Sequence, residues 1–225
     1  MPVNTSAYQS IYKELASSNV TLVAVSKTKP ASDILELYNL GHRDFGENYV
    51  QELTDKAKEL PAGIRWHFIG HLQTNKVKLI IPIVQLIHGV DSLKLLREIQ
   101  KQAAKAAKKV ECLLQVHIAM EETKFGLDET ELAEIITLSR AGEFSQLVIR
   151  GLMGMASFTE DMDKVGAEFR QLKTLFDKYA VDFGKAPVLS MGMSSDYRLA
   201  VSMGSNMVRI GSLLFGARSA GTTGH

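Results

Sequence analysis

Residues 21–27, Thr-Leu-Val-Ala-Val-Ser-Lys, form an almost purely apolar run that ends in a lysine. A short apolar run rich in β-branched residues is typical of a strand buried on both faces, as in a parallel sheet. Pro30 closes the run, and a helical pattern follows with Ser32 or Asp33 as its expected N-cap. Lys27 is therefore expected at the carboxyl end of a buried strand.

A lysine in this place is suited to covalent chemistry. Partial burial at the rim of a core disfavours the charged ammonium and leaves some of the amine neutral and nucleophilic. A neutral amine is what a Schiff-base lysine needs in order to react with an aldehyde. The alternative is that the Lys27 side chain simply reaches from the strand end into solvent.

Apolar strands alternate with helical patterns along the chain. After an amphipathic helix near residues 6–17, eight strands are predicted near residues 20–26, 43–45, 65–69, 86–88, 111–118, 147–152, 188–190 and 207–210. Helical patterns between them include residues 48–59, 92–109, 128–141 and 161–179. This alternation indicates an α/β fold with a parallel sheet. We expect a single (β/α)8 barrel of the TIM type over residues 1–218, with an extra N-terminal helix and a disordered polar tail at 219–225. An open doubly wound sheet is the structural alternative.

The composition argues against several classes of protein. Of the 225 residues, 45% are hydrophobic and 23% charged, which is ordinary for a soluble globular chain. The net charge of +1 gives no electrostatic reason to expect nucleic acid or membrane as a partner. The single Cys112 falls in a predicted strand, and the N-terminus lacks the pattern of a signal peptide. We therefore expect a cytoplasmic protein with no metal site.

Glycine and serine occur together in the loops after the last two predicted strands. In a barrel of this type, the loops at the carboxyl ends of the strands build the active site, and those after strands seven and eight often bind phosphate. These loops contain Gly192, Ser194, Gly211 and Ser212. Glycine lets the backbone approach an anion closely, while N–H groups and serine hydroxyls donate to its oxygens. We predict a phosphate site here, opposite Lys27. Alternatively, the glycines serve only turns and Ser194 caps a helix.

An amine opposite a phosphate site narrows the choice of ligand. Pyridoxal 5′-phosphate (PLP) fits, because its aldehyde condenses with an amine while its phosphate takes the anion site. A class I aldolase that holds a sugar phosphate would use the same two elements. Arg209 on the last strand favours PLP, since an inward guanidinium donates to the pyridine nitrogen and keeps it unprotonated. In the alternative, Arg209 points outward and pairs with a helix carboxylate.

Six segments in order along the chain resemble the pyridoxal phosphate homeostasis protein family, the stand-alone relatives of the alanine racemase barrel. They are AVSKTKP (24–30), FGENYVQE (45–52), WHFIG (66–70), RGLM (150–153), LSMGMS (189–194) and MVRIG (207–211). The resemblance implies that the cofactor PLP is carried by Lys27 as a Schiff base. The remaining residues that it implies as cofactor-binding are Asn48 beside the cofactor, Ser194, Gly211 and Ser212 on its phosphate, Arg209 at its ring nitrogen, and His67 and Met193 lining the pocket.

Two histidines near these segments have alternative interpretations. The alternative for His67 is a partly buried ring satisfied by neighbouring backbone. His71 stands where many relatives have proline, and we expect it to alter the stiffness of its loop more than cofactor binding.

Three functions are compatible with these features: a PLP carrier that serves intracellular PLP homeostasis, an amino-acid racemase of the alanine racemase type, and a sugar-phosphate aldolase. A two-base racemase needs a second acid or base on the far face of the cofactor, and in alanine racemase this is a tyrosine from an additional domain of the partner subunit. The sequence ends soon after the last predicted loop, so we expect no such domain. Only Tyr49 and Tyr197 are expected near the pocket rim. We therefore expect a monomeric PLP-binding protein without robust catalysis, with PLP-dependent apoenzymes as possible partners.

Overall fold

The computed structural model describes residues 3–119 and 125–216, with a closed barrel of eight parallel strands at its centre. Each strand pairs with the next in sequence, and β8 pairs with β1 to close the barrel. The strands are β1 (Thr21–Val25), β2 (Asp44–Glu47), β3 (Arg65–Phe68), β4 (Val84–Val90), β5 (Val110–Gln115), β6 (Leu147–Met153), β7 (Val188–Ser190) and β8 (Met207–Ile210). The predicted (β/α)8 barrel is confirmed, and the open-sheet alternative is wrong.

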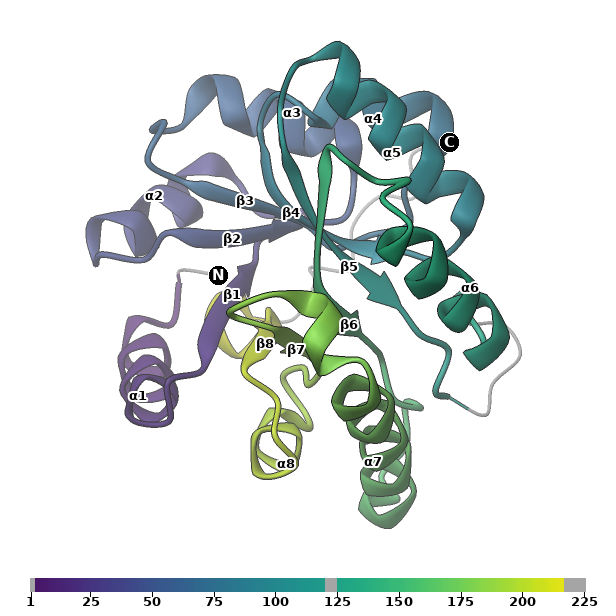
Figure 1. The fold of residues 1–225 in the computed structure, drawn as a ribbon. Helices are drawn as coiled ribbons and strands as arrows, with labels where there is room; N and C mark the ends of the chain where they lie inside the picture. Colours follow the sequence, from purple (N-terminus) through teal and green to yellow (C-terminus); the bar gives the residue numbers. More distant parts are fainter. Residues whose placement is uncertain (1–2, 120–124, 217–225) are drawn as a thin grey trace.

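Helices surround the barrel on its outside (Figure 1). They are α1 (Thr5–Ser17), α2 (Ala31–Asn39), α3 (Val50–Glu59), α4 (Val77–Ile80), α5 (Leu93–Lys105), α6 (Glu129–Arg140), α7 (Met162–Lys178), α8 (Tyr197–Ser202) and α9 (Ser212–Phe215), with 3-10 turns η1 (Thr74–Lys76) and η2 (Ala180–Phe183). The extra helix α1 precedes β1, and its N-cap Asn4 donates its N–H to the carbonyl of Leu214 in α9 at 2.8 Å. None of the helices in the described ranges combines the length and apolar character that a membrane span requires.

Apolar side chains form two layers, one on each side of the strands. In β1, Leu22 and Ala24 belong to the large cluster between the strands and the helices, while Val23 belongs to a small cluster inside the barrel. Successive residues of a strand point to opposite faces, so this division follows from the pleat. The inner cluster consists of Val23, Leu86, Leu113, Met153 and Met207. Toward the carboxyl ends of the strands, the next inward-facing positions of β4, β7 and β8 carry the buried polar residues His88, Ser190 and Arg209.

Several element boundaries differ from those predicted. The N-cap of α2 is Pro30 rather than Ser32 or Asp33, because the extended Pro30 backbone (φ −67°, ψ 157°) leads directly into the helix. Helix α3 begins at Val50 instead of residue 48. Helix α5 ends at Lys105 instead of residue 109, since Ala107 takes a left-handed conformation with φ 48°. The helical turns at 74–80 were not predicted. The predicted tail at 219–225 lies outside the described residues.

Candidate functional site

A cavity of about 520 Å³ opens at the carboxyl ends of the strands. This volume lies in the range of small-molecule and cofactor sites. Most of its wall is contributed by residues at or just after the ends of β1, β2, β3, β6, β7 and β8, which the closed barrel brings together. The lining residues are Val25, Lys27, Asn48, Ile69, Met155, Phe158, Met193, Ser194, Ser195, Arg209, Gly211, Ser212 and Leu213. Of the eight predicted site residues, all but His67 are therefore at one cavity.

Helix α3 fixes the backbone on both sides of Lys27. The ammonium of Lys56 donates to the carbonyl of Ser26 at 2.8 Å. On the other side, the Thr28 N–H donates to Oε1 of Glu52 at 2.6 Å. Thr28 has a φ of 62°, in the left-handed region, where a β-branched residue stores strain of roughly 1–3 kcal/mol. The chain therefore turns sharply just after Lys27, and α3 holds this turn in place.

A buried carboxylate completes the support behind Lys27. Oε1 of Glu47 accepts from the Ser26 hydroxyl at 2.6 Å and from the Lys56 ammonium at 2.7 Å. Its other oxygen, Oε2, is buried without a hydrogen-bond partner. Burial raises the pKa of Glu47 to about 7, against the opposing effect of the Lys56 charge. No pattern in the sequence indicated this cluster, because Ser26, Glu47 and Lys56 come from three separate parts of the chain.

The two glycine-containing loops meet on one side of the cavity. The Gly211 N–H donates to Oγ of Ser194 at 3.3 Å, which ties the loop after β7 to the loop after β8. Gly192 has a φ of +97°, and a Cβ there would lie 2.6 Å from the Cβ of Ala200, so no larger residue fits. Ser212 begins α9, where the first N–H groups of a helix have no partner within it. Hydroxyl and N–H donors at this wall are suited to an anion.

Arg209 points into the barrel, so its predicted inward orientation holds and the outward alternative is wrong. Its Nη1 donates to the carbonyl of Ser190 at 2.9 Å and to the Ser190 hydroxyl at 2.7 Å. Its Nη2 donates to the carbonyl of Gly154 at 3.1 Å. Burial lowers the pKa of Arg209 to about 10, which still leaves the guanidinium charged at neutral pH. A fixed cation thus forms part of the cavity wall.

Asn48 contributes an unpaired acceptor to the cavity. It follows β2 directly, and its Oδ1 is buried without a hydrogen-bond partner. A buried carbonyl oxygen without a donor is costly. A ligand that donates a hydrogen bond at this point would remove that cost.

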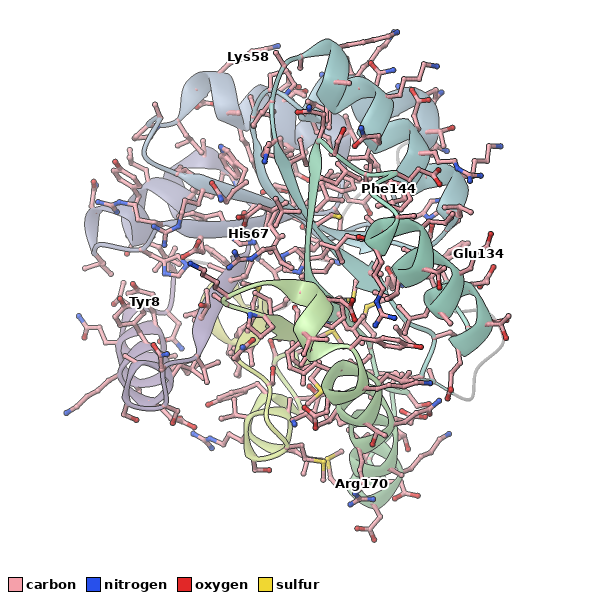
Figure 2. The ribbon with its side chains drawn as sticks, in the orientation of Figure 1. Tyr8, Lys58, His67, Glu134, Phe144 and Arg170 are labelled. Carbon is pink, nitrogen blue, oxygen red and sulfur yellow. The ribbon has the colours of Figure 1, made fainter. Side chains whose placement is uncertain are left out.

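The structure corrects the prediction for His67, which does not line this cavity. Its Nε2 lies 3.0 Å from Oδ1 of Asp44, and its Nδ1 lies 2.9 Å from Nε2 of His88. His67 is buried among the strands (Figure 2), whereas Lys58 and Arg170 lie on the outer helices. The reason is its position in β3: the cavity is reached by Ile69, two residues further along, on the same inward face.

The two tyrosines expected near the rim do not line the cavity. The Tyr197 hydroxyl donates to Oε2 of Glu14 at 3.1 Å, and Tyr49 is 57% exposed beside an adjoining hollow that His71 also lines. Among the described residues, the ionisable groups that line the cavity are the Lys27 amine and the Arg209 guanidinium.

A smaller cavity of about 300 Å³ lies near the amino ends of the strands. Its cations have partners in the protein: Arg65 pairs with Asp44, and Arg43 donates to the carbonyls of Tyr38 and His42. The cavity at the carboxyl ends is therefore the better candidate for a functional site.

Comparisons with known proteins identify the family of this chain. The family described as "Alanine racemase, N-terminal domain" matches residues 6–219. A pyridoxal phosphate homeostasis protein of Vibrio alginolyticus is 40% identical over 205 residues, which cover 89% of this chain and 87% of the relative. One from Aquifex aeolicus is 41% identical over 199 residues, covering 88% and 86%.

Solved structures share the architecture of this barrel. PipY of Synechococcus elongatus, in a structure with PLP bound, has a TM-score of 0.83 at 34% identity, covering 94% of this chain and 99% of PipY. Alanine racemase of Bartonella henselae shares the fold, with a TM-score of 0.70 at 18% identity over 96% of this chain and 60% of the racemase. The chain belongs to the pyridoxal phosphate homeostasis protein family, among the relatives of the alanine racemase N-terminal domain.

Proposed function

We propose that this protein binds PLP in the cavity, holds it as a Schiff base on Lys27, and takes part in PLP homeostasis without robust catalysis of its own. One observation carries the proposal: the Lys27 amine, the Arg209 guanidinium and the Ser194–Gly211 pair line a single cavity of about 520 Å³. The relatives named above are homeostasis proteins, and the PipY structure contains PLP, which supports the same ligand here.

Each residue has a defined role in this proposal. Lys27 supplies the amine for the PLP aldehyde, and Ser194, Gly211 and Ser212 hold the phosphate with hydroxyl and N–H donors. Asn48 Oδ1 accepts a hydrogen bond from the ligand, and Met193 contributes apolar wall. When bound, PLP supplies an electron sink for carbanions.

Arg209 decides how strong that sink is. A guanidinium donates hydrogen bonds and does not accept them, so at the ring nitrogen of PLP it favours the unprotonated form. An unprotonated ring withdraws electrons less strongly than a protonated one, which suits a carrier better than an enzyme.

A racemase is the second candidate, because PLP on a lysine is also its starting point. It needs an acid or base on each face of the substrate. Among the described residues that line the cavity, Lys27 is the one candidate for an acid or base, since Arg209 stays charged. This observation favours the carrier. Delivery of PLP to apoenzymes, a monomeric state and a cytoplasmic location stay predictions from the sequence.

Absorption spectra and chemical trapping test the proposal. Protein mixed with PLP should show the visible band of a Schiff base, and borohydride should fix PLP on the protein. Lys27→Ala should lose both while the cofactor-free variant keeps a cooperative melt, and Lys58→Ala, on the outside of α3, should keep both. Exchange of α-protons in D₂O, followed by NMR with several amino acids, should be far below enzymatic rates. Turnover at roughly 1–10³ per second would overturn the carrier in favour of the racemase.

A further inference from the structure

A continuous row of polar side chains crosses the barrel interior and ends at Arg209. Its first step is from Nη1 of Arg209 to Oγ of Ser190, at 2.7 Å. Oγ of Ser190 lies 3.3 Å from Nδ1 of His88. Nε2 of His88 lies 2.9 Å from Nδ1 of His67, whose Nε2 lies 3.0 Å from Oδ1 of Asp44.

The row is buried along its whole length. Ser190 and His88 are 0% exposed, His67 3%, Arg209 4% and Asp44 9%. These residues belong to strands β2, β3, β4, β7 and β8, so the row spans the barrel rather than following one strand. An interior row of this kind is costly unless its donors and acceptors match.

The donors and acceptors match in one direction when both imidazole rings are neutral. An ionised carboxylate only accepts, so Nε2–H of His67 donates to Asp44. Nδ1 of His67 is then an acceptor, and Nε2–H of His88 donates to it. Nδ1 of His88 in turn accepts from the Ser190 hydroxyl, whose oxygen accepts from Arg209. Burial is the largest of the effects that lower the pKa of His88 well below its usual value, followed by those of His67 and Arg209, and this agrees with a neutral His88 ring.

This order has an electrostatic consequence for Arg209. Among the ion pairs found in the described ranges, none joins a carboxylate to its buried guanidinium, although the charge of Asp196 raises the pKa of Arg209 against the effect of burial. The group dipoles of Ser190, His88 and His67 all point the same way, with their negative ends toward Arg209 and their positive ends toward Asp44. The carboxylate of Asp44 orients the row. Although burial opposes its ionisation, hydrogen bonds from Arg65 and His67 hold the pKa of Asp44 below its usual value.

We propose that Asp44, His67, His88 and Ser190 form an oriented chain that positions Arg209 and thereby keeps the ring nitrogen of the bound cofactor unprotonated. The four residues are positioning residues, since they act on the ligand through Arg209. The part that concerns the ring nitrogen rests on the proposed function. The positions of the protons along these four residues do not rest on the proposed function, because the protein alone sets them.

The first measurement uses the protein without cofactor. Long-range ¹H–¹⁵N NMR of the histidine rings should show both His67 and His88 as neutral Nε2–H tautomers. A proton on Nδ1 of either ring, or a charged ring near neutral pH, would overturn the proposal. This result does not depend on whether PLP binds.

The second measurement uses PLP labelled with ¹⁵N in its ring, bound to the protein. The wild-type resonance should be that of an unprotonated pyridine. In Asp44→Asn, which removes the charge at the far end of the chain while nearly keeping its shape, the resonance should move toward the protonated form. His88→Leu removes the central link and should give a larger shift, with PLP affinity reduced about tenfold, as for the loss of one hydrogen bond to a charged group.

A matched control separates positioning from general destabilisation. Glu111→Gln weakens the pair between Glu111 and Arg150 in the same barrel (3.7 Å), away from Arg209, and should leave the ¹⁵N resonance unchanged. If His88→Leu does not fold, Asp44→Asn decides the matter. If every folded variant at Asp44 or His88 gives the wild-type ¹⁵N resonance of PLP, the proposal is overturned. If the wild-type protein binds no PLP, the proposed function is refuted instead.

Discussion

Replacement of Lys56 by methionine tests how the end of β1, and with it Lys27, is held. The Lys56 ammonium donates to the Ser26 carbonyl at 2.8 Å and to Oε1 of both Glu47 and Glu52 at 2.7 Å. Lys56→Met keeps most of the buried stem but leaves Glu47, which is 0% exposed, without its cation. Removing one partner of a buried ion pair costs about 3–5 kcal/mol. At about 2–4 °C per kcal/mol for a chain of this size, the Tm should fall by about 6–20 °C.

The pH dependence gives this prediction a second arm. Burial already raises the pKa of Glu47 to about 7, and without the Lys56 charge the hydrogen bond from Ser26 is the one lowering effect that remains among those found. A carboxyl whose pKa is raised on folding destabilises the protein as pH rises, because the folded state binds the extra proton. The loss of unfolding free energy in Lys56→Met should therefore be larger at about pH 8 than at about pH 5, which urea unfolding at both pH values measures.

Two further variants complete the test. Removing both charges, in Lys56→Met with Glu47→Gln, should recover much of the loss, since the uncompensated carboxylate causes most of it. Lys58→Met, at a lysine with a side chain 78% exposed, should stay within about 0.5 kcal/mol of wild type. A Tm for Lys56→Met within about 2 °C of wild type, or a double variant less stable than the single one, would refute the reasoning.

Three other predictions concern acid stability and the anion wall. Burial lowers the pKa of His42 from 6.5 to about 4. The stabilisation that comes from its neutral ring is therefore fully present above pH 6.5 and is lost as the pH falls toward 4. Urea unfolding should show this loss, at most about 3 kcal/mol, and His42→Gln should reduce it; equal pH slopes would contradict the assignment. Gly192→Ala should lower stability by about 1–3 kcal/mol in thermal denaturation, because of the positive φ and the close Ala200 Cβ, and an unchanged Tm would contradict this. Ser194→Ala should raise the Kd for PLP about tenfold in a fluorescence titration, while the cofactor-free Tm falls by no more than about 6 °C through loss of the hydrogen bond from Gly211; an unchanged Kd would exclude Ser194 from the phosphate site.

The sequence predicted the features that depend on local pattern. The alternation of apolar runs and helical segments was enough for the barrel, and the carboxyl ends of β1, β7 and β8 located Lys27, Ser194 and Gly211 at one cavity. These inferences hold because every strand of a parallel barrel ends at the same rim.

Features that depend on contacts between distant elements were missed. Lys56 meets Ser26 across 30 positions of sequence, and no local pattern marks it as buried. His67 was placed at the cavity because it lies in a matching segment, but its depth in the barrel depends on the register of β3 against β4, which shifts at Trp66 and His67. The interaction of His67 with His88 could be predicted only if β3 and β4 were known to be neighbouring strands and both imidazole rings were known to face into the barrel.

Borohydride reduction followed by peptide mapping tests the central claim most directly. Protein incubated with PLP and reduced should carry the label on one peptide, at Lys27. The nearby Lys29, whose ammonium donates to the carbonyl of Phe215 at 2.7 Å, should remain unlabelled. Label on Lys29 or spread over surface lysines, with Lys27 unmodified, would contradict the assignment of Lys27 as the residue that holds the cofactor.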